Sequence, residues 1–334
     1  MSTASKSPRK VAAVAFETGS RMLPDYSHRF SRHDFTLAQL FACLVLRKFF
    51  KAGYRDICAY LDDWPTLRQD LGLDKTPHFT TLQKAERKLL RDARIRKMLT
   101  QTIDLALSRD VREASQPRET HMVERVAVDS TGFEGGRCSR YFVRRRSRAP
   151  DAWQTTTYRR FGKLGIAVDC DTHLILATHR GQGPRPDVDQ LLPLLEGFCL
   201  NAIPEQILAD AGYDSEMNHE LLREYLGIDS IIPATSGRPT DSLPTGKYRF
   251  LMQTEFDDES YGQRWQAETV MFMLKQHQGD ALTARTYQTR RREMGLMCLT
   301  HNITIAYARR GFLQGRSGAV FSPASSFSAW SLVG

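Results

Sequence analysis

The sequence contains no long apolar run. No stretch approaches the roughly 20 apolar residues that a membrane-spanning helix needs, and residues 1–10 lack the apolar core of a secretory signal. The six cysteines are scattered and form no Cys-x-x-Cys pair, which argues against a zinc site or a disulfide framework. These absences predict a cytoplasmic protein with no membrane partner.

Acidic residues are the scarcer charge. Lys and Arg number 47 against 38 Asp and Glu, so the formal net charge is +9. A positive balance favours a polyanionic partner, with nucleic acid as the first candidate. The 334 residues, 41% of them hydrophobic, are enough for two globular domains with a substantial core.

The N-terminal third combines helical spacing with positive charge. Residues 1–34 are polar and are expected to form a flexible arm, whereas apolar residues recur at helical spacing from Phe35 to Phe50. A basic helix is predicted from about Thr80 to Thr100. Its candidate DNA contacts are Lys84, Arg87, Lys88 and Arg91. Short helices ahead of a basic one are typical of a helix-turn-helix DNA reader, and a helical bundle with a solvated basic face is the alternative.

Two strands are predicted to end at aspartates. The segment 123–133 alternates as a strand around Asp129, and Ile207–Ala209 is a strand followed directly by Asp210. A hairpin is predicted from Leu164 to Thr178. Because open sheets flanked by helices carry their sites at the C-terminal ends of strands, both aspartates are candidate site residues. Taken alone, either aspartate is more often a strand-end cap than a metal ligand.

A basic loop rich in aromatic residues separates the first strand from the hairpin, between positions 137 and 163. Positive charge interleaved with aromatic rings suits a DNA backbone and exposed bases. The candidate DNA contacts in it are Arg144, Arg145 and Arg146. A solvated loop is the alternative.

The segment Tyr261–Lys275 is predicted to be a helix that carries a polar stripe. At about 100° per residue, its polar-tipped residues fall within a stripe roughly 60° wide, and apolar residues fill the opposite side. The stripe consists of Tyr261, Arg264, Glu268 and Lys275. A solvated helix face would show the same pattern.

The spacing Tyr–x2–Arg–x3–Glu–x6–Lys resembles the signature of DDE transposases from prokaryotic insertion sequences, of the insertion-sequence-4-type superfamily. VDSTG resembles the first-aspartate motif of this group, ADAGYDS resembles the second, and PHFTTLQK loosely resembles its N-terminal region. The resemblance covers residues 123 to 302, with a weaker likeness from 36 to 90. Three motifs in the expected order make it specific.

The resemblance implies a fold and a site. The fold is an α/β, ribonuclease-H-like core, a mixed sheet flanked by helices, with an all-α N-terminal DNA-binding region. The expected divisions are an arm at 1–34, a helical DNA-binding domain at 35–118, the catalytic domain at 119–310 and a disordered tail at 311–334. Asp129, Asp210 and Glu268 are the implied catalytic metal ligands, since three carboxylates can hold two Mg²⁺ ions, with Mn²⁺ as substitute. Tyr261, Arg264 and Lys275 are implied DNA contacts, and Ser130, Thr131, Tyr213 and Asp214 are expected to support the ligands.

The implied function is that of a DNA transposase. It binds the terminal inverted repeats of its element, cleaves phosphodiester bonds at the ends and joins the 3′ ends to target DNA. Its partner is double-stranded DNA, both transposon ends and target, and a homo-oligomer is expected in a synaptic complex at the nucleoid. The alternatives are a domesticated DNA-binding protein that does not cleave and a nuclease that only hydrolyses.

Overall fold

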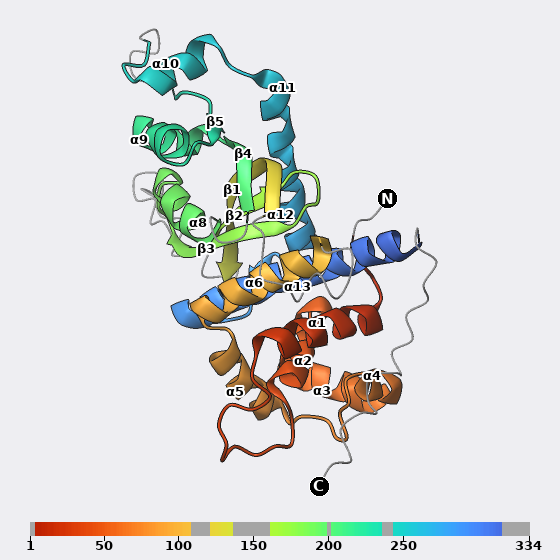
Figure 1. Ribbon diagram of the computed structural model, residues 1–334. Helices are drawn as coiled ribbons and strands as arrows, with labels where there is room; N and C mark the ends of the chain where they lie inside the picture. The colour runs from red at the N-terminus through yellow and green to blue at the C-terminus, as the bar shows by residue number, and fades with distance from the viewer. Residues whose placement is uncertain (1–3, 108–120, 136–160, 199–201, 236–242, 316–334) are drawn as a thin grey trace, which may run out of the picture.

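The computed structural model describes residues 4–107, 121–135, 161–198, 202–235 and 243–315. A helical N-terminal part and a sheet flanked by helices are separated by the long helices α6 and α13, which lie side by side (Figure 1). One cluster of buried apolar residues runs through both parts. No helix within these ranges has both the length and the apolar character needed to cross a membrane.

The helices of the N-terminal part precede the sheet in the chain. They are α1 (Pro8–Met22), α2 (Leu37–Phe49), α3 (Tyr54–Asp63), α4 (Pro65–Asp70), α5 (Phe79–Leu89) and α6 (Asp92–Leu107). The start of α2 is fixed by a capping box, in which the Thr36 hydroxyl accepts from the Gln39 N–H at 3.2 Å and the Gln39 side chain accepts from the Thr36 N–H at 2.8 Å. All residues of this helix except Gln39 and Phe49 are buried.

The flexible arm expected at residues 1–34 is wrong for residues 8–22, which form α1. Val11 and Ala15 are buried, and α1 packs closely on α2. A Cβ added at Gly19 would lie 2.9 Å from the Ala38 Cα, so glycine permits this approach. The sequence pattern missed the helix because its buried stripe consists mostly of small residues. The tail expected to be disordered begins inside α13, and residues 316–334 lie outside the described residues.

The sheet has the strand order β3-β2-β1-β4-β5, and β6 also pairs with β1. Strand β2 is antiparallel to both its neighbours, whereas β1, β4 and β5 are mutually parallel. The strands are β1 (His121–Gly135), β2 (Phe161–Asp169), β3 (Ile175–Gly183), β4 (Ala202–Ala209), β5 (Asp229–Ile231) and β6 (Ala281–Leu282). This is the ribonuclease-H-like arrangement that the sequence predicts, and the β2–β3 hairpin confirms the alternation read there.

Helices connect the parallel strands and complete the layers on the sheet, because parallel pairs require crossover connections. The crossovers run through α8 (Leu191–Phe198) and α9 (Glu216–Glu220). The remaining helices are α10 (Lys247–Thr254), α11 (Asp258–Tyr261), α12 (Trp265–Gln278) and α13 (Tyr287–Gly315). Helix α12 packs on β1 and β2 and reaches down to α13 (Figure 1).

The single helix predicted at Tyr261–Lys275 is divided at its beginning. A 3₁₀ turn, Gly262–Arg264, separates α11 from α12, as is common at helix N-termini. The backbone stays right-handed helical through the turn, so the polar stripe is preserved. Helix α12 ends at Gly279, whose φ of 99° places it in the region that favours glycine.

A buried ion pair joins the N-terminal part to the sheet-bearing part. Lys48 of α2 donates to the carboxylate of Glu293 in α13 at 3.0 Å, and both side chains are less than 10% exposed. Glu293 also accepts from the Thr283 hydroxyl at 3.1 Å and from the Ala284 N–H at 2.9 Å. Burial opposes its ionised form, but the charge of Lys48 and these N–H groups outweigh that cost and lower the pKa of Glu293.

We expect Glu293→Ala to lower the free energy of unfolding by about 3–5 kcal/mol, because Lys48 would remain as an uncompensated buried charge. Urea unfolding of the full chain measures this change. Glu259→Ala, at an exposed position of α11, is the control and should stay within about 0.5 kcal/mol of the parent protein. Equal free energies of unfolding for the two variants would show that the Lys48–Glu293 ion pair does not stabilise the fold.

Candidate active site

The pairing of β1 with β4 brings Asp129 and Asp210 together. The two strands are parallel, and Val128 pairs with Ala209. Each aspartate is the next residue along its own strand direction, so the two lie side by side where neighbouring strands are about 4.8 Å apart. Both are half-buried. The C-terminal edge of a parallel pair is where open α/β sheets place their sites.

Asp129 lies in the electrostatic field of two other carboxylates. Its pKa is raised to about 6, mainly by burial and also by the negative charges of Asp210 and Glu268, while the Ser130 N–H and Arg264 oppose the rise. The Ser130 N–H donates to its carboxylate at 2.7 Å. The charges of Asp210 and Glu268 therefore both act on Asp129.

Asp210 is oriented by the turn that follows β4. Its carboxylate accepts from the Gly212 N–H at 2.9 Å and so caps a short 3₁₀ turn. A Cβ at Gly212 would lie 3.0 Å from that carboxylate oxygen. The glycine of the ADAGYDS segment therefore leaves room for the close approach of the Asp210 carboxylate to the backbone.

Glu268 lies in the first turn of α12 and its side chain is 54% exposed. It forms an ion pair with Arg264, one helical turn earlier. The Arg264 guanidinium lies 5.7 Å from the centre of the Tyr261 ring. The signature residues at the start of the stripe are therefore in contact with one another.

Lys275 connects the other end of the stripe to the first strand. Its ammonium donates to the Thr131 hydroxyl at 2.6 Å and lies 5.6 Å from the centre of the Phe133 ring. Thr131 is two residues beyond Asp129. Lys275 therefore brings this end of the stripe into contact with β1, close to Asp129.

The carboxylates are of the type that a hard divalent cation prefers, although their arrangement in the structure is not a complete coordination site. Among the described residues, no group of three or more His, Cys, Asp or Glu is close enough together to hold a metal ion. The Glu268 carboxylate is paired with Arg264. The donor set consists only of oxygen ligands, which Mg²⁺ and Mn²⁺ prefer. Cations there would offset the repulsion that raises the pKa of Asp129. The oxygen ligands of Asp129, Asp210 and Glu268 are therefore of the type that Mg²⁺ or Mn²⁺ would require.

Asp187 was not anticipated from the sequence. It follows β3 and accepts from Lys163 at 2.9 Å, from the Gln190 amide at 2.7 Å and from the Ser130 hydroxyl. Ser130 is the next residue after Asp129, so Asp187 is connected to Asp129 through one hydrogen-bonded residue. In the sequence it is only an acid ahead of a helix, and no local pattern distinguishes it.

Tyr213 is buried beneath these acids. Burial raises the pKa of its phenol, and the charges of Asp187, Asp129 and Asp210 raise it further. Its hydroxyl has no hydrogen-bond partner among the described residues by distance and angle. The predicted supporting residues Ser130, Thr131 and Tyr213 therefore all lie beside the carboxylates.

Asp214 is the exception among the predicted supporting residues. Its carboxylate accepts from the Arg249 guanidinium at 2.9 Å and from the Thr235 N–H and hydroxyl at 2.7 Å. Burial opposes its ionisation, but hydrogen bonds from His219, Arg249 and Thr235 outweigh it and lower its pKa. Asp214 ties the segment after β5 to α10, so its contacts are structural and the expected support of the ligands is wrong.

The remaining predicted DNA contacts fall in two places. Lys84, Arg87 and Lys88 are exposed on α5, and Arg91 is exposed directly after it. Arg144, Arg145 and Arg146 lie outside the described residues.

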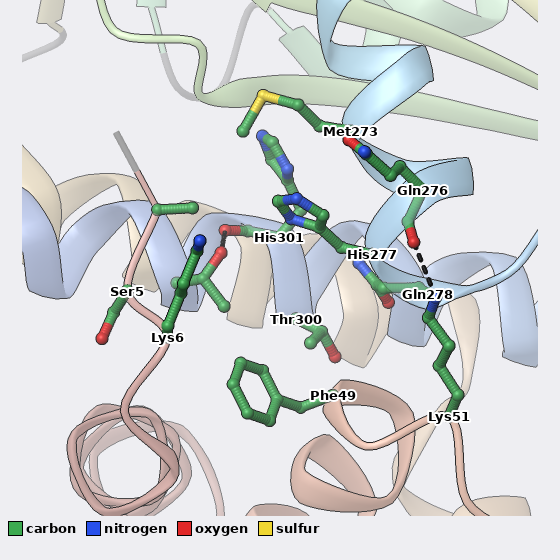
Figure 2. Close-up of a pocket in the computed structure, with 12 residues that line it drawn as sticks. Ser5, Lys6, Phe49, Lys51, Met273, Gln276, His277, Gln278, Thr300 and His301 are labelled. Carbon is green, nitrogen blue, oxygen red and sulfur yellow. Dashed lines mark hydrogen bonds between the residues drawn. The ribbon is translucent and has the colours of Figure 1, made fainter. Parts of the chain in front are cut away.

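A separate cavity of about 250 Å³ lies at the opposite end of α12 (Figure 2). Lys6, Lys51, His277 and His301 line it, and Lys51 donates to the Gln276 carbonyl at 2.7 Å. Nine helical steps of about 1.5 Å each separate Glu268 from His277, a distance of about 14 Å along the helix. No carboxylate lines this cavity, so it is distinct from the Asp129–Asp210 site.

Comparison with known proteins agrees with the site. Residues 123–303 match the protein family described as "Transposase DDE domain". This span runs from β1 into α13 and contains all three carboxylates. No curated protein matches the chain. A solved structure described as "Crystal structure of a pre-cleavage Mos1 transpososome" aligns over 92% of this chain and 86% of that chain, at 12% identity and a TM-score of 0.21, a score too low to establish a common fold.

Proposed function

Because the chain belongs to the transposase DDE-domain family, we propose that it is a transposase of the insertion-sequence-4 type that cleaves the ends of its own element and joins the 3′ ends to target DNA. The pairing of β1 with β4 carries this proposal. It places Asp129 beside Asp210 at the C-terminal end of the β1–β4 pairing, and the charge of Glu268 also acts on Asp129.

Asp129, Asp210 and Glu268 would hold the divalent cations. When bound, Mg²⁺ or Mn²⁺ activates the attacking oxygen and stabilises the leaving oxygen of a phosphodiester. The protein's own part is orientation. The Ser130 and Gly212 N–H groups fix the two aspartates, and Glu268 is carried by the first turn of α12.

Arg264 and Lys275 supply positive charge on either side of Glu268. In the free protein Arg264 is paired with Glu268 and Lys275 with Thr131. A phosphate of the bound DNA would replace these partners, because guanidinium and ammonium groups form strong charge-assisted bonds to phosphate oxygens. Exchange at Arg264 would also release Glu268 to join the aspartates.

The proposal includes the partners and the place of action. The substrates are double-stranded transposon ends and target DNA, two ends are held by a homo-oligomer in a synaptic complex, and the reaction takes place at the nucleoid in a prokaryotic cytoplasm. Lys84, Arg87, Lys88 and Arg91, with Arg144, Arg145 and Arg146, are proposed DNA contacts.

Incubation of the purified protein with DNA flanking its coding sequence tests the function. With Mg²⁺ or Mn²⁺, cuts at the element boundaries and joining of the 3′ ends to a target plasmid are expected, and EDTA should prevent both. Cleavage without joining would favour a nuclease that only hydrolyses. Binding without cleavage would favour a domesticated DNA-binding protein.

Asp187→Asn is expected to weaken metal binding by about 10–100-fold, because groups that orient a metal ligand typically contribute this much. Asn retains the shape but loses the charge that holds Lys163 and Ser130. The measurement is the Mg²⁺ concentration that gives half-maximal end cleavage, which should rise, with cleavage recovering at high Mg²⁺. A role in folding alone would not shift this midpoint.

Asp189→Asn is the matched control, two residues away in the same segment and exposed. Its Mg²⁺ midpoint should equal that of the parent protein. A parent-like midpoint in Asp187→Asn as well would remove Asp187 from the site.

A further inference from the structure

A hollow of about 340 Å³ is lined entirely by basic residues. They are Lys84, Arg87, Lys88, Arg91 and Arg292. The first four come from α5 and the segment after it, in the N-terminal part. Arg292 comes from α13, which belongs to the catalytic part. We call this the basic hollow.

The charges of the basic hollow have no partner among the residues that the structure describes. None of the five side chains forms an ion pair or a side-chain hydrogen bond within the described part of the chain. Cations close by are engaged instead, with Arg291 bound to Asp92 at 2.7 Å and Arg94 to the Lys88 carbonyl at 2.8 Å. The fold therefore leaves these five charges uncompensated.

The one acid of α5 does not neutralise them. Glu86 is turned into the interior, where it accepts from Arg47 at 2.8 Å and from the Tyr54 hydroxyl. Leu82 and Leu89 are buried on the same side. The outer face of α5 is left with cations alone, and five like charges around one hollow repel each other unless an anion lies between them.

From this arrangement we infer that the basic hollow binds the sugar–phosphate backbone of the DNA end, and that Arg292 is a DNA contact contributed by the catalytic part. The inference rests on the proposed function. A duplex offers a phosphate about every 3.4 Å along each strand, so a run of phosphates can satisfy five cations where one small anion cannot.

The inference changes the role expected of α5. Phosphate contacts fix register and orientation without reading sequence, so the basic face would position the end, and base recognition would belong to other residues. Because α5 and α13 lie in different parts of the protein and contact each other, a backbone held by both is placed at a fixed distance from Asp129 and Asp210.

The test uses the full chain in EDTA, so that binding is measured without cleavage. Affinities for a terminal-repeat duplex and for a random duplex are measured across a salt series. For Arg292→Ala, the slope of log K against log salt should fall by about 0.9, the value for one lost phosphate contact. Affinity should fall by the same factor for both duplexes, and Arg292→Lys should keep the parent slope.

Arg9→Ala is the matched control, because the Arg9 guanidinium is already paired with Asp70. Its slope should equal that of the parent. Thermal unfolding checks that each variant is folded; should Arg292→Ala unfold, Lys88→Ala must show the same loss of slope.

A folded Arg292→Ala protein with the parent slope would overturn the inference, as would a loss confined to the terminal repeat. If Arg292→Ala keeps the parent slope and the wild-type protein cleaves and joins DNA normally, the inference about the basic hollow is wrong and the proposed function stands. A wild-type protein that binds neither duplex would overturn it together with the proposed function.

Discussion

Asp129→Asn, Asp210→Asn and Glu268→Gln are each expected to slow metal-dependent end cleavage by at least about 10³-fold, or about 4 kcal/mol of activation free energy. Each amide keeps the size of the side chain but removes a negatively charged oxygen ligand. Two cations are needed to serve both the attacking and the leaving oxygen, so loss of any one carboxylate disables the whole site.

End binding should be retained in all three variants, because a carboxylate makes no attractive contact with a phosphate that its neutralisation could remove. Cleavage is measured as product formed from end duplexes at saturating protein, and binding is measured in the same series without metal. A parent-like cleavage rate in one variant would exclude that residue from the site.

The structure decides which aspartate is the proper control. Asp171 is exposed in the β2–β3 turn, so Asp171→Asn should cleave normally. Asp169 is buried and accepts from the Asp171 N–H at 3.0 Å and from the Thr172 hydroxyl. Asp169→Asn is therefore less suitable, because it perturbs the turn as well as the charge.

Arg264→Ala and Lys275→Ala are expected to reduce end cleavage by about 100-fold each, because displacement of the scissile bond near the chemistry costs about that much in rate. Both side chains are partly exposed, and exposed ion pairs contribute roughly 0–1 kcal/mol to stability. The variants should therefore fold normally. Cleavage rates and urea unfolding, measured together, separate the two effects.

Gln276→Ala is the control for this pair, since Gln276 is exposed on the same helix. Gln278 is unsuitable as a control, because its side chain is buried and donates to the Met297 carbonyl at 2.9 Å. Parent-like cleavage by both Arg264→Ala and Lys275→Ala would mean that the stripe is only a solvated face.

Features of the site that depend on neighbouring residues could be predicted from the sequence alone. The strand end before Asp210 could be predicted because alternation and its interruption are properties of a few adjacent residues. The stripe on α12 could be predicted for the same reason, since helical period relates positions only three to seven residues apart. The strand end predicted at Asp129 is wrong, because β1 continues to Gly135 through its pairing with β2. The ribonuclease-H-like fold followed from the order of these elements and from the family resemblance.

The tertiary structure decided what depends on segments far apart in the chain. The pairing of Val128 with Ala209 sets one aspartate beside the other, and the hairpin and the loop after it bring Asp187 to Ser130. Whether a charge is free also depends on distant partners. Arg47 removes Glu86 from the face of α5, and Arg292 of α13 joins the cations that remain. The periodicity of a short segment does not predict such contacts, because they join residues far apart in the chain. They form only when the segments pack together, and this packing determines which charged side chains are paired within the protein and which remain available to bind DNA.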